Sequence, residues 1–143
     1  RNKPDLAEFM GAMFGNRLVS LNFHNEIDLI IAVPLHPLKL KRRGYNQADY
    51  IAKGISEKLN IEFDSKVIIR NRFTETQTKK SRFNRYSNMD GVFEILNESK
   101  IRGKRVALVD DVLTTGATLE VAGAEILKAG CSELSILTLA AAL

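Results

Sequence analysis

The chain has 143 residues, of which 45% are hydrophobic and 27% are charged, and its formal net charge is +4. This length suits a single domain over residues 1–143, and the composition excludes wholesale disorder and, since no apolar run approaches about 20 residues, a transmembrane helix. The single cysteine, Cys131, excludes an internal disulfide and a cysteine metal cluster, which favours a reducing, cytoplasmic location.

The first half of the chain predicts two helices and one buried strand. A helix is expected from about Asp5 to about Leu21, within an N-terminal helical segment over 1–26, because apolar residues recur there at helical spacing. The apolar run Asp28–Pro34 predicts a strand, which is followed by a basic loop over Leu35–Gly44 and a helix over Asn46–Leu59. The apolar residues of the first helix are Leu6, Phe9, Met10, Met13, Phe14 and Leu18.

The second half predicts strands at Lys66–Arg70, at Gly91–Ile95 and at Lys104–Asp111, of which the last is the clearest. A helix over Thr118–Ala129 and a buried strand over Glu133–Ala141 complete the chain. Strands that alternate with helices predict an α/β fold: a single domain with an open, mainly parallel sheet flanked by helices.

Two loops and one long segment are the places where function is expected. Ligands of such sheets bind beyond the carboxyl ends of the strands, which points to the loops after Val33 and Val109. The segment 70–89, Arg70–Met89, carries six basic residues and one acid, and most of it has no helical or strand periodicity. It is interpreted either as a flexible binding loop that closes over a site or as a solvated surface loop.

The charge is concentrated in the middle of the chain. Residues 39–105 hold 17 of the 21 Lys and Arg residues against 8 Asp and Glu, a balance of +9, whereas the first 38 residues sum to −1 and the last 38 to −4. This distribution predicts an anionic ligand, for which phosphate esters, pyrophosphate and nucleic acid all qualify.

The motif with the most chemistry follows the clearest strand. Asp110 and Asp111 end the apolar run, and a turn over Thr114–Thr118 then opens a helix. Gly116 allows a tight turn and close approach of a ligand, while the helix N-terminus and the threonine hydroxyls suit a phosphate dianion. Thr118 is a candidate N-cap. The residues of the predicted phosphate site are Thr114, Thr115, Gly116, Ala117 and Thr118.

Two adjacent carboxylates would repel a phosphate, but they accept hydrogen bonds from the sugar hydroxyls next to it. The pattern therefore describes a site for a ribose 5-phosphate. It lacks the Gly-Lys-Ser/Thr of a nucleotide P-loop and the GxGxxG of a dinucleotide site, and an ordinary Asp-capped turn would explain only one acid and one threonine.

The stretch Val106–Thr118 resembles the signature of type I phosphoribosyltransferases. This resemblance implies the type I phosphoribosyltransferase fold. It also implies that Asp110 and Asp111 hold the ribose hydroxyls of phosphoribosyl pyrophosphate, while Thr114–Thr118 holds its 5-phosphate.

A second stretch, Val33–Ser56, is similar to the ComF family, with a Val-Pro-x-His-Pro opening and an Arg-Gly-aromatic-Asn-Gln core at Arg43–Gln47. That family is associated with natural competence and DNA uptake. Its members often begin with a four-cysteine zinc-binding segment, which is missing here. Either the sequence is trimmed or this member lacks the segment, so no zinc is expected in this chain. Further residues similar to the family are Arg72, Thr74, Gln77, Arg85, Asn88, Gly91 and Phe93.

Type I enzymes place a pyrophosphate-binding loop after the first strand, which assigns Leu35, His36 and Arg43 to that role. His36 can instead fill a turn between two prolines, and Arg43 can belong to a solvated face. Asn46 and Gln47 can cap the following helix rather than contact a ligand.

The resemblance implies an enzyme that transfers a phosphoribosyl group to an unidentified acceptor and releases pyrophosphate. Mg²⁺ would be carried by the substrate, so no direct side-chain ligand is predicted for it, with Asp110 or Asp111 as the alternative. Arg82 and Arg85 would close over the leaving group. No general base is evident. The alternative is a non-catalytic module that senses phosphoribosyl pyrophosphate or binds single-stranded DNA. A homodimer is compatible with either function.

Cys131 is interpreted as a core residue rather than a functional one.

Overall fold

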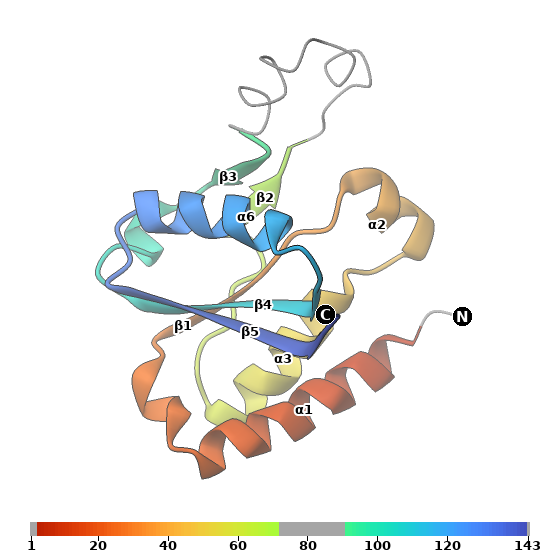
Figure 1. Ribbon diagram of the computed structural model, residues 1–143, viewed down its shortest axis with the longest axis vertical. Helices are drawn as coiled ribbons and strands as arrows, with labels where there is room; N and C mark the ends of the chain where they lie inside the picture. Colours follow the sequence, from red (N-terminus) through yellow and green to blue (C-terminus); the bar gives the residue numbers. More distant parts are fainter. Residues whose placement is uncertain (1–2, 72–90, 143) are drawn as a thin grey trace.

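A computed structural model describes residues 3–71 and 91–142 of the chain (Figure 1). Three of the helices lie in the first part, and the longest strands lie in the second. Two short 3-10 helices, η1 at Phe23–Glu26 and η2 at Glu98–Lys100, connect neighbouring elements. The helices and strands are α1 (Pro4–Ser20), β1 (Leu29–Ala32), α2 (Pro37–Arg43), α3 (Gln47–Leu59), β2 (Ile68–Arg70), β3 (Phe93–Ile95), β4 (Arg105–Leu113), α6 (Ala117–Lys128) and β5 (Glu133–Ala141).

The sheet at the centre of the fold has the order β1-β4-β5, and all three strands are parallel. Alternate residues of β1 and β4 face two separate cores, as the period of two of a strand requires. Ile30 and Ala107 pack with α1 and α3, whereas Ile31 and Leu108 pack with α6, β2 and β3. The helices therefore cover both faces of the sheet (Figure 1), and the predicted α/β class with a parallel sheet is confirmed.

The strands β2 and β3 form an antiparallel pair of their own rather than extending the parallel sheet. Their register places Arg70 opposite Phe93. The pair packs through Ile68 and Phe93 against the same core as α6.

The helices α1 and α3 pack together through small residues. The buried face of α1 is Ala7, Gly11, Gly15 and Leu18. A Cβ atom on Gly11 would lie only 2.2 Å from the carbonyl oxygen of Ile51, and one on Gly54 would lie 2.2 Å from that of Glu8. The helix was expected here, but most of the large apolar residues that predicted it are exposed: Leu6, Phe9, Met10 and Met13.

The predicted basic loop over Leu35–Gly44 is wrong in part, because α2 occupies most of it. Pro37 stands at the start of this helix, the His36 side chain caps it, and Gly44 ends it in a left-handed conformation with a φ of 90°. The run of basic side chains predicted a loop, whereas the proline and the glycine that flank this run are the signals of a helix.

The two other corrections concern the ends of elements. β4 continues past Asp111 to Leu113, and the N-cap of α6 is Gly116 rather than Thr118. The predicted segment 70–89 lies outside the described residues except for Arg70 and Asn71. Within the described ranges, no helix is both long and apolar enough to cross a membrane.

Candidate functional site

The candidate site lies where β4 extends beyond its neighbour β1. Val109 pairs with Ala32, the last residue of β1, so Asp110 and Asp111 stand past the end of that strand. On the other side β5 continues alongside, and Asp110 pairs with Thr138. One sheet edge thus presents both half-buried carboxylates at the carboxyl end of the central strand, where open α/β sheets bind ligands.

The turn over residues 114–118 follows these carboxylates and leads into α6. Gly116 has a backbone φ of 82°, which residues with a Cβ atom rarely adopt. It is the N-cap of α6 and makes no side-chain hydrogen bond there. Thr115 Oγ1 accepts a hydrogen bond from the Ala117 amide at 3.3 Å, so this hydroxyl is partly used inside the turn.

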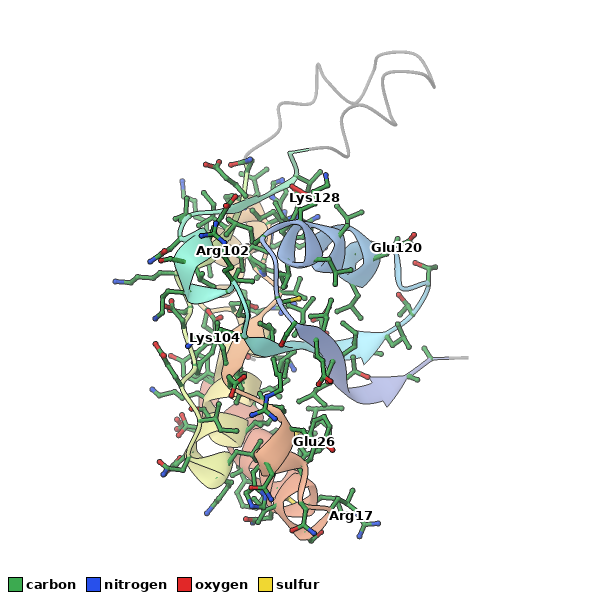
Figure 2. The ribbon with its side chains drawn as sticks, turned by 90° about the vertical axis from the view of Figure 1, so that its left-hand side faces the viewer. Arg17, Glu26, Arg102, Lys104, Glu120 and Lys128 are labelled. Atoms are coloured by element: carbon green, nitrogen blue, oxygen red, sulfur yellow. The ribbon has the colours of Figure 1, made fainter. Side chains whose placement is uncertain are left out.

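The positive end of the α6 dipole favours an anion at this turn, although the nearby Glu120 carboxylate partly opposes it. Glu120 lies near its N-terminal end and Lys128 at its C-terminal end (Figure 2), the arrangement that complements a helix dipole. A cavity of about 60 Å³ opens at the positive end of that dipole. Its lining consists of Asp110, Val112 and every residue from Thr114 to Leu119. The predicted phosphate turn and Asp110 therefore meet in one cavity, whereas Asp111 is not among its lining residues.

The ionisation of Asp110 is shifted by its surroundings. Burial raises the pKa of this carboxyl to about 6, and the neighbouring Asp111 charge acts in the same direction. A hydrogen bond from the Asp111 amide to Asp110 Oδ1, at 2.8 Å, and the positive charge of Arg70 partly oppose this rise in pKa. A hydrogen-bond donor or a cation that binds beside Asp110 would relieve the cost of keeping it charged.

The loop after β1 is held by Asn46, the buried N-cap of α3. Its Nδ2 donates to the Val33 carbonyl oxygen at 3.0 Å, and its Oδ1 accepts from the Ala48 amide at 3.2 Å. Of the two roles left open for Asn46, the structure shows the capping one, whereas Gln47 is the first residue of the helix. One side chain thereby fixes both the loop and the helix that follows it.

His36 and Arg43 take part in local hydrogen bonds. His36 Nδ1 accepts from the Leu38 amide at 3.1 Å, so the predicted turn role of this residue is observed. Its other ring nitrogen, Nε2, then carries the proton when the imidazole is neutral. Arg43 Nη1 donates to Gln47 Oε1 at 3.4 Å.

A cleft of about 240 Å³ lies beside this loop, and we call it the β1 cleft. Of the three predicted pyrophosphate residues, Leu35 lines the β1 cleft, and His36 and Arg43 are not among its lining residues. Its walls are Ala32, Pro34, Leu35, Pro37, Leu40, Asn46, Asp49, Ser65, Ile68, Ile69 and Arg70.

Sequence reasoning missed two charged residues of the β1 cleft, Asp49 and Arg70. Burial raises the pKa of Asp49 to about 6, against the effect of its hydrogen bond with Asn46. The sequence analysis gave Arg70 no role in the site, although it ends a predicted strand and begins the basic segment 70–89. Its place at the end of a predicted strand was a signal, because strand ends are where such sheets gather functional side chains.

The remaining predicted residues lie elsewhere. Arg82 and Arg85 fall outside the described residues, as do Arg72, Thr74, Gln77 and Asn88. Within residues 3–71 and 91–142, no three His, Cys, Asp or Glu side chains are grouped as a metal site would require. Cys131 is partly buried against the α6 core, and burial raises the pKa of its thiol.

Comparison with known proteins identifies the family of the chain. Residues 40–143 match the family described as phosphoribosyl transferase domain. The chain is 37% identical over 116 residues to Competence protein F of Haemophilus influenzae and 33% identical over 109 residues to DNA utilization protein YhgH of Escherichia coli K12. These relatives confirm the resemblance to the ComF family. The matches cover 80% and 76% of this chain but 51% and 47% of the relatives, so the chain spans about half of their length.

Solved structures show the same fold. The Bacillus subtilis glutamine phosphoribosylpyrophosphate amidotransferase, complexed with ADP and GMP, superposes with a TM-score of 0.68 at 21% identity, covering 93% of this chain and 26% of that one. A purine phosphoribosyltransferase from Pyrococcus horikoshii gives a TM-score of 0.56 at 27% identity, covering 96% of this chain and 73% of the other. The predicted type I phosphoribosyltransferase fold is confirmed.

Proposed function

Because this chain belongs to the phosphoribosyl transferase domain family, we propose that it binds phosphoribosyl pyrophosphate and transfers the phosphoribosyl group to an acceptor, with release of pyrophosphate. The observation that carries the proposal is the shared cavity of Asp110 and the 114–118 turn. A ribose 5-phosphate presents hydroxyl donors and a dianion a short distance apart, which matches a carboxylate beside a helix N-terminus.

The turn would hold the 5-phosphate through backbone amides at the start of α6 and through its exposed threonine hydroxyls. Asp110 would accept hydrogen bonds from the ribose hydroxyls, with Asp111 as the adjacent carboxylate. The two acids would also stabilise positive charge that develops on the sugar ring when the bond to pyrophosphate breaks. Fixing the sugar at both ends aligns its anomeric carbon with the acceptor.

The residues fit a magnesium ion carried by the substrate. Two half-buried carboxylates at one strand end offer the oxygen ligands that Mg²⁺ prefers, and one or two such groups suffice when phosphates supply the rest. When bound, the ion would neutralise charge on the departing pyrophosphate. Asp110 and Asp111 are the side chains that would hold it, and the rise in the pKa of Asp110 would be reversed by its charge.

Titration calorimetry with phosphoribosyl pyrophosphate and Mg²⁺ tests the binding step. The double variant Asp110→Asn, Asp111→Asn should lose affinity by about tenfold or more, since each charge-assisted hydrogen bond contributes about 1.5–3 kcal/mol. Most of the loss should come from Asp110→Asn, because Asp110 lines the cavity. The control is Glu57→Gln, an exposed acid near the C-terminal end of α3. Equal affinities in all variants would contradict the ribose assignment.

Pyrophosphate release tests the transfer step. The protein is incubated with phosphoribosyl pyrophosphate, Mg²⁺ and a panel of nucleobases and amines, and release is followed for each. Release that depends on one acceptor identifies it and supports catalysis. Binding without release from any acceptor would instead support a module that senses phosphoribosyl pyrophosphate.

A second candidate function, binding of single-stranded DNA, rests on a different surface. Lys39, Lys41 and Arg42 are exposed on the short helix α2, and relatives carry the name DNA utilization protein. A DNA titration at several salt concentrations, with the triple variant Lys39→Gln, Lys41→Gln, Arg42→Gln, tests it. Affinity should fall steeply with salt in the native chain and less steeply in the variant. Identical salt slopes would reject this role for α2.

A further inference from the structure

Helix α1 is apolar on both of its sides. Its inner side packs against α3 through small residues, whereas its outer side carries large ones: Phe9 is 61% exposed and Met13 is 58% exposed. The helix runs along the outside of the molecule (Figure 1), and its large exposed side chains recur at the i, i+3, i+4, i+7 spacing of one helix face. We call this face the α1 stripe; it consists of Leu6, Phe9, Met10 and Met13.

The α1 stripe has the character of an interaction surface. A helix that is apolar all round is ordinarily covered on all sides, because large apolar side chains are unfavourable in water. Contiguous exposed apolar patches therefore mark places where a protein or a membrane binds.

The charges around the α1 stripe do not suit a membrane. Helices that lie on anionic lipid surfaces are rich in lysine and arginine. The α1 stripe instead has an acid, Asp5, beside its first residue and a base, Arg17, one turn beyond its last, and the first 38 residues of the chain sum to −1. Both charged side chains are exposed, and neither forms an ion pair with another described residue. Arg17 lies at the surface of the molecule in Figure 2.

The pattern of α1 is complementary to itself. In an antiparallel pair of α1 helices, the N-terminal end of each lies beside the C-terminal end of the other, so Asp5 of each copy faces the partner's Arg17. With the pair centred at the level of Gly11, Phe9 lies opposite the partner's Met13, and contacts between a thioether and an aromatic ring are favourable. The antiparallel orientation also suits the two helix dipoles. One two-fold axis thereby satisfies the acid, the base and the apolar side chains together.

We infer that the α1 stripe is the contact surface of a homodimer, in which two copies of this chain pair α1 with α1 in antiparallel orientation. The inference is independent of the proposed transfer of a phosphoribosyl group. The interface uses one helix from each copy, which places it at the small end of specific interfaces, so we expect a Kd of about 10–100 μM.

Sedimentation equilibrium of the 143-residue chain, from about 1 to about 500 μM at low salt, measures this affinity. The mass should rise from the 16.0 kDa of one chain toward twice that value. The double variant Phe9→Gln, Met13→Gln should raise the Kd by about tenfold or more, because it removes the central apolar contacts. The matched control is Leu127→Gln on α6, since Leu127 is also 58% exposed, and it should leave the Kd within about twofold.

Charge reversal tests the antiparallel orientation. Asp5→Arg brings two arginines together at each end of the pair, and Arg17→Asp brings two carboxylates together there. Each variant alone should therefore raise the Kd by about fivefold or more. A mixture of the Asp5→Arg chain with the Arg17→Asp chain places opposite charges at both ends again, so the mixed dimer should form with a Kd within about twofold of the native one.

Melting curves show whether each variant is folded, and the mixture of charge-reversed chains serves as the test should the apolar variant fail to fold. A native chain that stays monomeric at every concentration overturns the inference and leaves the α1 stripe to a different protein. A dimer that Phe9→Gln, Met13→Gln does not weaken forms through another surface, which also overturns it. A mixture that restores no affinity rejects the antiparallel pairing.

Discussion

Two half-buried carboxyls, those of Asp49 and Asp110, are kept in surroundings that disfavour their charge. Burial raises the pKa of each to about 6, above the value of 3.8 that an exposed aspartate has. The folded state therefore binds a proton more tightly than the unfolded chain does between these two pH values. Such groups lower the stability of the protein at neutral pH, which is common where a ligand is to supply the missing partner.

The pH dependence of stability should reveal this cost at Asp110. The contribution of its raised pKa favours the folded state below about pH 4 and is lost as the pH rises through about 6. Asp110→Asn removes the charge and should raise the melting temperature at pH 7.5, with a gain that shrinks to nothing near pH 4. Differential scanning calorimetry across this range measures it.

Asp64 provides a control of opposite sign. Its hydrogen bonds with Lys100 and with the Lys66 amide lower the pKa of its carboxyl, so this charge stabilises the fold at neutral pH. Asp64→Asn should lower the melting temperature at pH 7.5, and the loss should fade as the pH drops below about 4. If Asp110→Asn lowers the melting temperature at neutral pH, as Asp64→Asn should, the account of Asp110 is wrong.

At the scale of elements, the packing of α1 on α3 depends on having no side chain at the contact. An alanine in a helix is ordinarily more favourable than a glycine by about 1 kcal/mol. At Gly11 we expect the reverse, because the new Cβ would overlap the Ile51 carbonyl oxygen. Gly11→Ala should destabilise the protein by about 1–3 kcal/mol in urea unfolding, as overpacking does.

The exposed residue Asn16 of the same helix is the matched control for Gly11. Asn16→Ala should change the free energy of unfolding by no more than about 0.5 kcal/mol. A neutral or stabilising Gly11→Ala would mean that α1 and α3 are further apart than the structure places them.

The 114–118 turn gives the second prediction at this scale. Inorganic phosphate or sulfate should bind there without any substrate, because three threonines and the N-terminus of α6 line one cavity. Gly116→Val should abolish this binding, since the φ of 82° is strained for a β-branched residue. Asp110→Asn should keep or strengthen it, because a nearby negative charge is removed.

Crystals grown in sulfate, together with the rise in melting temperature caused by phosphate, would show where an anion binds. If the turn is empty and anions instead line the loop after β1, the assignment of the anion site to the 114–118 turn is wrong.

At the scale of the whole molecule, much of the fold could be predicted because strands and helices differ in period and the strands here are strongly apolar. The run from Val106 to Val109 is fully buried, as its composition predicted. The face that α1 buries could not be predicted in the same way. Hydrophobic spacing identified the helix, yet close packing selected its small residues, Gly11 and Gly15, for the interior.

The site shows the same division. Asp110 and the 114–118 turn are neighbours in the sequence, so one motif revealed them together. The strand that ends at Arg70 could be predicted, but the place of Arg70 beside the site depends on the pairing of β2 with β3, which is a tertiary arrangement. The sequence left two roles open for His36, binding and a turn between two prolines, and the structure shows the second, in which His36 caps α2.

The pairing of β1 with β4 also has a consequence for how the chain is made. Leu29 pairs with Val106, and Asp28 forms an ion pair with two hydrogen bonds to Arg105. The first strand therefore cannot form its ladder until residues 77 positions later have been synthesised. On the ribosome, α1 and α3 are complete long before β1 has its ladder partner. Until then Ile30 and Ile31, which are fully buried in the folded chain, lack part of their cover. Exposed apolar strands of this kind bind chaperones and aggregate, so slow translation of this region should increase aggregation.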